Sequence, residues 1–267
     1  MTQPAVMGIL NITPDSFFAD SRVSLSHAID TAQQMLDDGA TFVDIGGYST
    51  RPGAAPVSPT EEADRVLPII ETLSSTFPDA LISIDTFRAS VARQAVAAGA
   101  AIINDVSGGT LDLEMFATAA ELSQSKAVPY ILMHLRGTPQ TMQSLANYGN
   151  VVTDVLDELA TRLSELRSLG AKDIILDPGF GFAKTPAQNF ELLHHLPAFR
   201  GFDEPVLVGL SRKTTIWKTL NIKPEEALNG TTVLNTVALL NGASILRVHD
   251  VREAVEAVKL LQHLTFF

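Results

Sequence analysis

Eight short apolar runs, separated by longer segments, are the feature that most constrains how this chain can fold. The runs are Val6–Asn11, Phe42–Gly46, Leu81–Asp85, Ala101–Asp105, Tyr130–His134, Asp173–Asp177, Val206–Gly209 and Ile245–His249. They are nearly continuous in Val, Ile and Leu, a pattern typical of parallel strands that are covered on both faces. The clearest helix between them is Val151–Leu169, where apolar residues recur at helical spacing.

Gly-Ala pairs recur between the apolar runs. Gly-Ala pairs at 39–40, 99–100, 170–171 and 242–243 stand just before every second run, at spacings of 60, 71 and 72 residues. Each spacing fits about two strand–helix units, and Gly readily takes the left-handed conformation that ends a helix. Eight units predict a single-domain α/β fold, a (β/α)8 TIM barrel over residues 1–267. A doubly wound open sheet is the rival, but the chain has no dinucleotide fingerprint.

Charge and composition exclude several classes of protein. The chain has 19 Lys and Arg against 30 Asp and Glu, a net charge of −11, so neither nucleic acid nor an acidic membrane is an expected partner. Because it has no cysteine, disulfides, thiolate nucleophiles and Cys-ligated metals are impossible. The start of the chain lacks the basic residues of a secretory signal, and no apolar stretch is long enough to span a membrane. We therefore expect a cytoplasmic protein.

Polar residues stand where the apolar runs end. They are Asn11, Asp85, Asn104, Asp105, His134, Asp177, Arg247 and His249. A parallel barrel carries its active site at the carboxyl ends of its strands. Because side chains alternate along a strand and helices cover the outside, Arg247 and His249 should point into the barrel mouth. By the same logic, Asp85 and Asp177 point inward.

Three loops at this end of the barrel carry further signal. Segments 12 to about 24 and 47 to about 59 are longer than the usual connection from strand to helix, which suggests lids. The third loop, 209–214, places Ser211, Arg212, Lys213 and Thr214 at a helix start. Barrels often bind anions there, helped by the helix N–H groups.

Two other motifs are decoys. Residues 179–185 (GFGFAKT) resemble a P-loop, but Ala183 stands where a glycine should precede Lys184, so a nucleotide site of that kind is rejected. His194 and His195 lie in a predicted helix with no carboxylate at metal-ligand spacing, and we interpret them as surface or packing residues.

Seven motifs follow one another along the chain: Gly8–Phe17 (GILNITPDSF), Asp44–Gly53 (DIGGYSTRPG), Ser83–Thr86 (SIDT), Ile103–Val106 (INDV), Leu176–Phe182 (LDPGFGF), Gly209–Lys213 (GLSRK) and Arg247–His249 (RVH). As a set they resemble the dihydropteroate synthase family of pterin-binding enzymes, over essentially the whole chain. The resemblance implies a transferase that joins 6-hydroxymethyl-7,8-dihydropterin pyrophosphate to p-aminobenzoate and releases pyrophosphate, with Mg²⁺. It also implies a homodimer formed through barrel helices.

The resemblance implies a pterin site made of Asp85, Asn104, Met133, Asp177 and Lys213. A pterin has a flat edge of ring nitrogens and an exocyclic amine. A carboxylate such as Asp177 can accept two hydrogen bonds from this edge, and an amide such as Asn104 can both donate and accept. Met133 would pack on the ring, although alternation leaves open whether Met133 or His134 faces inward.

For the pyrophosphate, the resemblance implies Asn11, Arg247 and His249, with Asn11 also the Mg²⁺ ligand. Arginine offers a planar fork for phosphate oxygens, and a metal ion would neutralise charge on the leaving group. The catalytic residues are then Asp15, Lys213, Arg247 and His249. The family is thought to react by a dissociative route, and Asp15 would stabilise the cation that this route leaves on the pterin.

The second substrate needs a slot for its ring and a site for its carboxylate. The resemblance implies a p-aminobenzoate site made of Thr50, Arg51, Pro52, Phe182, Ser211 and Thr214. Phe182 and Pro52 can sandwich the ring, while Lys213 and the helix start hold the carboxylate. Because the amine is already nucleophilic at neutral pH, no activated Ser or Cys is needed.

Three departures from the family pattern fall near these motifs: Tyr48 where Glu is common, Phe18 where Ser is common, and Ala183 where Gly is common.

Other functional interpretations stay open. A methyltetrahydrofolate-dependent methyltransferase domain shares the barrel but needs no pyrophosphate site. A Schiff-base aldolase would use Lys213, which lies in a loop rather than in a strand. A non-catalytic pterin-binding homologue would be expected to have lost charges that this chain keeps.

Overall fold

Eight parallel strands form a nearly closed barrel in the computed structural model, which describes residues 3–12, 21–49 and 56–264. The strands are β1 (Ala5–Asn11), β2 (Phe42–Gly46), β3 (Leu81–Asp85), β4 (Ile102–Asp105), β5 (Tyr130–Met133), β6 (Ile174–Asp177), β7 (Leu207–Val208) and β8 (Ile245–Val248). Their order is β6-β5-β4-β3-β2-β1-β8-β7, and a parallel bridge from Leu176 to Val206 joins the two edges.

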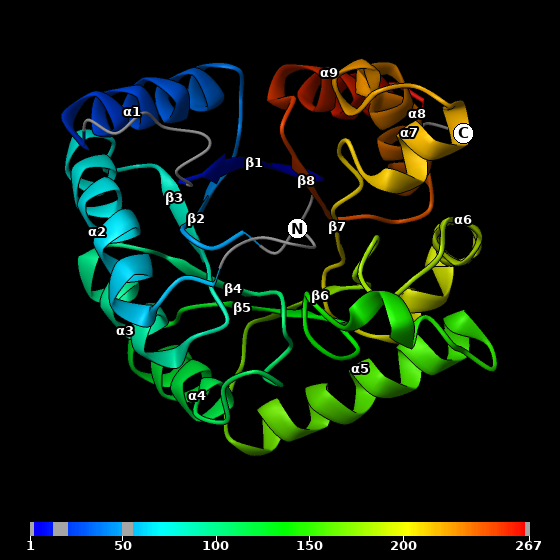
Figure 1. Cartoon of the computed structure of the whole chain (residues 1–267), viewed down its shortest axis with the longest axis horizontal. Helices are drawn as coiled ribbons and strands as arrows, with labels where there is room; N and C mark the ends of the chain where they lie inside the picture. Colours follow the sequence, from blue (N-terminus) through cyan, green and yellow to red (C-terminus); the bar gives the residue numbers. More distant parts are fainter. Residues whose placement is uncertain (1–2, 13–20, 50–55, 265–267) are drawn as a thin grey trace.

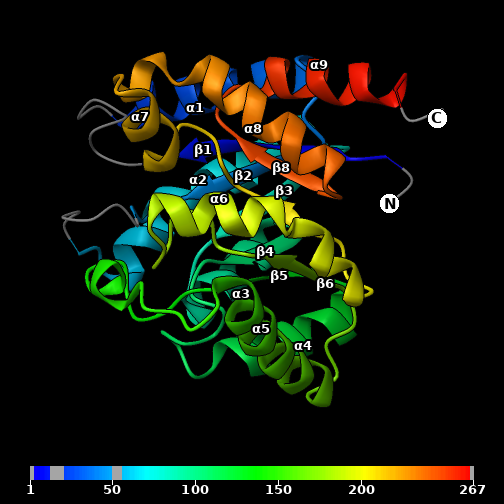
Figure 2. The same cartoon turned by 90° about the vertical axis from the view of Figure 1, so that its right-hand side faces the viewer.

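Helices surround the strands as an outer ring (Figure 1). They are α1 (Ser21–Asp37), α2 (Pro59–Thr76), α3 (Ala89–Ala98), α4 (Met115–Lys126), α5 (Val151–Ser168), α6 (Pro186–His194), α7 (Thr214–Leu220), α8 (Leu228–Leu240) and α9 (Val251–Gln262), with 3-10 turns η1 (Met142–Leu145), η2 (Leu196–Gly201) and η3 (Pro224–Glu226). In the side view, α1, α8 and α9 lie on one side of the strands and α3 to α5 on the other (Figure 2). The predicted (β/α)8 barrel is confirmed.

Local signals in the sequence set the helix ends. The Asn150 side chain accepts the N–H groups of Val152 and Thr153, both at 3.0 Å, and so caps the start of α5. Thr185 and Gln188 form a capping box at the start of α6. The Gly-Ala pairs end helices as predicted, because the glycines at 39, 99, 170 and 242 have φ angles of 100°, 121°, 96° and 103°.

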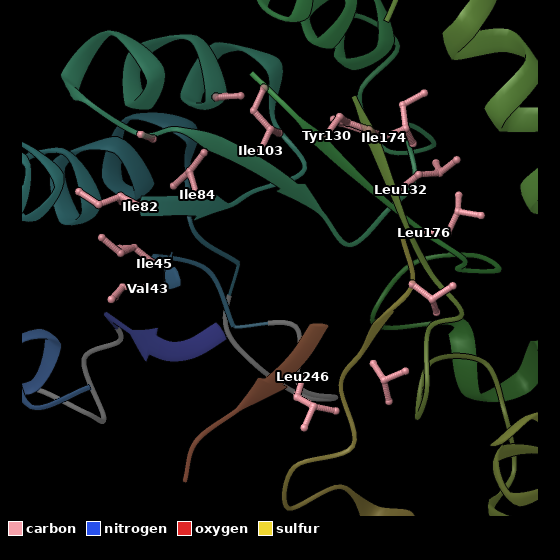
Figure 3. Close-up of a cluster of buried hydrophobic side chains, with 14 of the residues drawn as sticks. Val43, Ile45, Ile82, Ile84, Ile103, Tyr130, Leu132, Ile174, Leu176 and Leu246 are labelled. Atoms are coloured by element: carbon pink, nitrogen blue, oxygen red, sulfur yellow. The ribbon is translucent and has the colours of Figure 1, made fainter. Parts of the chain in front are cut away.

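Alternation along each strand separates two layers of apolar side chains. The outward layer packs against the helices, and Figure 3 shows Val43, Ile45, Ile82, Ile84, Ile103, Tyr130, Leu132, Ile174, Leu176 and Leu246 in it. The inward layer is a separate cluster of Ala5, Met7, Phe42, Ile102, Ile131, Ile175, Leu207 and Ile245. This inward cluster fills the amino-terminal half of the barrel, so ligands can enter only from the carboxyl-terminal half.

The structure also bears on the helices as possible membrane spans and on the histidine pair of α6. No helix among the described residues is both long enough and apolar enough to cross a membrane. His194 and His195 are exposed at the end of α6, with their rings packed edge to face at 4.7 Å, as expected for surface residues.

Candidate active site

Several of the predicted polar residues lie in a row around the carboxyl-terminal edge of the barrel. In the register between neighbouring strands, Asn11 is opposite Gly46, which in turn is opposite Asp85. Asp85 is opposite Asn104 on the next strand. Strands β1 to β4 therefore bring an amide, a carboxylate and a second amide to one edge, as the alternation of side chains requires.

Met133 faces the barrel interior, whereas His134 faces the helices. Met133 is opposite Asp177 in the register between β5 and β6. It belongs to a small apolar cluster with Val106, Leu135, Met142 and Ala183, bordered by Phe87 and Phe182. The Nε2 atom of His134 instead lies 3.0 Å from Oε2 of Glu158 on α5. The alternative left open by the sequence is thus resolved in favour of Met133.

Arg247, which is half-buried, is the centre of a network of charges that includes the fully buried Asp44. Its Nε donates to Asp44 Oδ2 and its Nη2 donates to Asp85 Oδ2, both at 2.6 Å. The Nδ2 atom of Asn104 donates to the same oxygen of Asp44 at 2.9 Å. Asp44 therefore joins the predicted pterin residue Asn104 to the predicted pyrophosphate residue Arg247, which also holds Asp85.

Asp44 is a site residue to which the sequence reasoning assigned no role. It is fully buried, and its Oδ1 has no hydrogen-bond partner among the residues that the structure describes. The signal was available: a carboxylate stands in the middle of an apolar run, on the same face as Phe42 and Gly46. A buried carboxylate normally needs a cation beside it, and Arg247 supplies one.

Burial leaves the inward carboxylates short of compensating charge. Desolvation raises the pKa of Asp85 to about 7, although Arg247 acts in the opposite direction. Desolvation also raises the pKa of Asp177, against the influence of the Gly179 N–H and of Lys213. Carboxylates with raised pKa values gain most from a ligand that brings its own hydrogen-bond donors, which makes this edge a candidate binding site.

Asp177 and Lys213 form the second half of the site. The N–H of Gly179 donates to Asp177 Oδ1 at 2.7 Å, and no other described residue hydrogen-bonds this carboxylate. The Nζ atom of Lys213 lies 4.1 Å from the centroid of the Phe182 ring, a cation–π contact. Burial, helped by the nearby charge of Arg247, lowers the pKa of Lys213 to about 8.

His249 is paired with Ser211 rather than standing alone. The Ser211 hydroxyl lies 3.0 Å from His249 Nδ1 and accepts the backbone N–H of His249 at 3.1 Å. Arg212 turns away and holds Asp250 through two hydrogen bonds of 2.9 and 2.7 Å. Thr214 begins α7 and is exposed. Among the hydroxyls predicted for p-aminobenzoate, Ser211 is thus already engaged with the predicted pyrophosphate residue.

Several predicted residues lie outside the described ranges. They are Asp15 in the first loop, and Thr50, Arg51 and Pro52 in the second, together with the departure at Phe18. The two predicted lids contain these residues. The helices that follow the loops begin at Ser21 and Pro59.

Tyr48 and Ala183, the other two departures from the family pattern, lie within the described ranges. The Tyr48 ring packs edge to face on Phe87, with centroids 5.1 Å apart, and the Arg88 guanidinium lies 5.3 Å from the centre of the Tyr48 ring. Ala183 is buried with a φ of 49°, a left-handed conformation that glycine would adopt with less strain. Tyr48 therefore belongs to an aromatic cluster beside the second loop.

A magnesium site at Asn11 fits the residues present. No group of three or more His, Cys, Asp or Glu side chains that could hold a metal occurs within the described ranges. The half-buried Asn11 side chain makes no hydrogen bond to another described residue. Because Mg²⁺ in proteins keeps several waters and binds substrate phosphates, the Asn11 amide oxygen is compatible with a magnesium site.

The fold and the site together define a (β/α)8-barrel enzyme with a polar binding site at the carboxyl ends of its strands. Comparison with known proteins makes the class specific. The family described as "pterin binding enzyme" matches residues 7–249. A dihydropteroate synthase from Synechocystis is 48% identical over 97% of this chain and 89% of its own length.

Solved structures agree with this match. A Yersinia pestis dihydropteroate synthase in complex with a sulfonamide drug superposes with a TM-score of 0.91, at 41% identity over 98% of this chain and 94% of that chain. A Xanthomonas albilineans dihydropteroate synthase with 4-aminobenzoic acid gives 0.91, at 38% identity over 99% and 94%. The chain belongs to the pterin-binding enzyme family, and the resemblance read from its seven motifs is confirmed.

Proposed function

We propose that this chain catalyses the dihydropteroate synthase reaction, in which 6-hydroxymethyl-7,8-dihydropterin pyrophosphate and p-aminobenzoate give 7,8-dihydropteroate and pyrophosphate. The observation that carries the proposal is the inward placement of Asp85, Asn104 and Asp177 around the half-buried Arg247. This set offers acceptors to the amine and ring N–H groups of a pterin, and a cation to an anionic leaving group.

Pterin recognition rests on the deepest polar groups. The Gly179 N–H fixes one oxygen of Asp177, which leaves Oδ2 to accept from the pterin. Asn104 is oriented by its bond to Asp44, so its amide oxygen is free to accept while its NH₂ is held. Because these side chains are preorganised, little conformational entropy is lost when the ring binds.

Bond breaking places negative charge on the leaving pyrophosphate. The C–O bond between the pterin methylene carbon and the pyrophosphate breaks, and a C–N bond to the aryl amine forms with loss of one amine proton. Arg247 uses two of its five N–H groups on Asp44 and Asp85, so the others can stabilise the departing oxygens. His249, held by Ser211, adds a donor beside it.

The aryl substrate would bind beside Phe182 and Lys213, which contact each other. The Phe182 ring offers an apolar face, and the Lys213 ammonium offers a counter-charge for the carboxylate. Support comes from the Xanthomonas relative, whose structure contains 4-aminobenzoic acid, and from the sulfonamide bound to the Yersinia relative. We expect sulfonamides to compete with p-aminobenzoate for this chain.

We also propose Mg²⁺ dependence, with Asn11 as the protein ligand. When bound, the ion would neutralise charge on the pyrophosphate. Removal of Mg²⁺ should weaken pyrophosphate binding in calorimetry, and Asn11→Ala should weaken it without any further effect of Mg²⁺. Equal pyrophosphate affinity with and without Mg²⁺ in the unaltered protein would contradict this part.

A homodimer through barrel helices is the partner that we propose. Large apolar side chains are exposed on α7 and α8: Leu220 at 52%, Val233 at 52% and Leu240 at 58%. Light scattering should give twice the chain mass, and Val233→Lys should shift it toward the monomer. A monomeric mass at micromolar concentration contradicts the dimer. The expected cytoplasmic localisation stays a prediction.

The activity assay tests the central proposal. Purified protein with Mg²⁺ and both substrates should release pyrophosphate and form dihydropteroate, whereas either substrate alone should give no product. Pterin binding without turnover would favour a binding homologue. Transfer of a methyl group from methyltetrahydrofolate would favour the methyltransferase alternative.

A further inference from the structure

Lys184 is a buried lysine that the proposed reaction does not use. It is 3% exposed, and its Nζ donates to His134 Nδ1 at 2.9 Å, to the Gly179 carbonyl at 3.0 Å and to the Phe182 carbonyl at 3.1 Å. An ammonium has three N–H donors, so each donor has an acceptor. This is the lysine of the rejected P-loop motif, and it lies inside the loop that joins β6 to α6.

The charge of Lys184 is balanced through His134. Because Nδ1 of the imidazole accepts from Lys184, its proton is assigned to Nε2, which donates to Glu158 Oε2 at 3.0 Å. Burial lowers the pKa of His134 to about 4, which agrees with a neutral ring. Burial also lowers the pKa of Lys184 to about 7, opposed by Asp177 and Glu158. A neutral ring thus connects the buried ammonium to a carboxylate on α5.

The same ammonium fixes the turn that holds Asp177. Gly179 has a φ of 70°, and a Cβ added there would lie 2.0 Å from the His134 carbonyl oxygen, so the turn packs tightly on the end of β5. The N–H of Gly179 orients the Asp177 carboxylate at 2.7 Å, while the carbonyl of Gly179 is bound by Lys184. Lys184 therefore orients the residue that orients the predicted pterin carboxylate.

A second branch leads from Lys184 to the aryl slot. Lys184 binds the carbonyl of Phe182, whose ring contacts the Lys213 ammonium at 4.1 Å from the ring centroid. The next residue, Ala183, has a left-handed φ of 49°, a strained backbone conformation for a residue other than glycine. The hydrogen bond from Lys184 to the Phe182 carbonyl therefore lies next to a strained backbone position.

We propose that Lys184 is a positioning residue that sets, from behind the β6–α6 loop, the orientation of both the Asp177 carboxylate and the Phe182 ring. It touches neither substrate. Its loss should therefore weaken pterin and p-aminobenzoate binding together, while the Arg247 end of the site, held by other strands, keeps its affinity for pyrophosphate. This inference rests on the proposed function.

The first experiment replaces Lys184 by Met, which has similar length and no donor. Calorimetry at a temperature where all variants are folded should show pterin affinity reduced by at least about tenfold, as expected when buried hydrogen bonds are lost. The KM for p-aminobenzoate should rise, and pyrophosphate affinity should stay unchanged. The matched control is Lys172→Met, at an exposed position before β6, which should behave as the unaltered protein.

A pair of His134 variants keeps the proposal testable if Lys184→Met does not fold. Asn places its amide near the Nδ1 position and can still accept from Lys184, whereas Gln places its amide near Nε2 and retains only Glu158. Pterin affinity should survive in His134→Asn and fall in His134→Gln, even where both lower the melting temperature.

Four outcomes separate the hypotheses. Unaltered pterin affinity in Lys184→Met, or equal pterin affinity in the two His134 variants, overturns the positioning role. Parallel loss of pterin and pyrophosphate affinity in Lys184→Met also overturns it, because that result describes general destabilisation. Failure of the unaltered protein to bind pterin contradicts the proposed function instead.

Discussion

The two halves of the barrel interior are built on the same strands and the same face, yet they differ in chemistry. Toward the amino-terminal ends, the inward residues are apolar, among them Met7, Phe42 and Ile131, all buried. Two residues further along β2, the inward position is the fully buried Asp44, bound to Arg247. Burying charge costs free energy that apolar packing would not. We attribute the charges of the carboxyl-terminal half to ligand binding, as proposed above, and the stability of the barrel to the apolar packing of the amino-terminal half.

The largest effect on this comparison is expected for Arg247→Met, because the substitution should lower both the stability of the protein and its turnover. The substitution leaves the fully buried Asp44 and the half-buried Asp85 without their cation, and breaking a buried pair typically costs about 3–5 kcal/mol of unfolding free energy. Turnover should also be lost. Urea unfolding and the product assay measure the two effects.

The control for that substitution is Arg252→Met, on the exposed surface of α9. It should leave stability and turnover unchanged. An Arg247→Met protein as stable as the unaltered chain would show that the buried network is not held by its cation.

Ile131→Ala tests the amino-terminal half alone. Ile131 is fully buried, so the cavity left behind should lower the unfolding free energy by about 2–5 kcal/mol. Pterin affinity of the folded fraction should be unchanged. Leu113→Ala, at a position 93% exposed, is the matched control and should alter stability by less than about 0.5 kcal/mol. Reduced pterin affinity in Ile131→Ala would mean that the two halves are coupled.

A smaller effect is expected at Glu158, outside the barrel. Partial burial acts to raise its pKa, but the hydrogen bonds from His134 and Arg136 lower it to about 2. The unfolded chain therefore takes up this proton at a higher pH than the folded one, and the stabilisation is lost as pH falls from about 4.5 toward 2.

Glu158→Gln should accordingly be less stable than the unaltered protein above about pH 4.5, with a difference that shrinks as the pH falls. Urea unfolding at several pH values measures it. Glu165→Gln, at an exposed position of the same helix, should show no such trend. A difference that is independent of pH would contradict the conclusion that His134 and Arg136 stabilise the ionised carboxylate.

The sequence predicts the strands well because the strands of a parallel barrel are covered on both faces and therefore appear as continuous apolar runs. The run Phe42–Gly46 is the observed β2, and Ala101–Asp105 differs from β4 by one residue. The predicted helix over 151–169 differs from α5 at its last residue only. Alternation within one strand also suffices to turn Asp85 and Asp177 inward. These features depend on residues close in sequence.

What sequence reasoning missed depends on how distant strands meet. Asp44 and Arg247 are 203 residues apart and pair because β2, β1 and β8 are neighbours in a given register. In the sequence alone, Lys184 is part of a segment that fails the P-loop pattern. Its hydrogen bond to His134, which follows β5, becomes visible only in the folded structure. Spacing along the chain carries no information about either contact.

The most direct test compares two inward positions of β6, Ile175 and Asp177, which are 5% and 6% exposed. The measurement is a calorimetric titration of 6-hydroxymethyl-7,8-dihydropterin pyrophosphate into Ile175→Val and Asp177→Asn. The account predicts an unchanged pterin Kd for Ile175→Val, with a loss of about 0.5–1.5 kcal/mol in stability. It predicts a pterin Kd raised at least about tenfold for Asp177→Asn, whose melting temperature stays near that of the unaltered protein. Equal pterin affinity in the two variants, with a large loss of stability in Asp177→Asn, would contradict it.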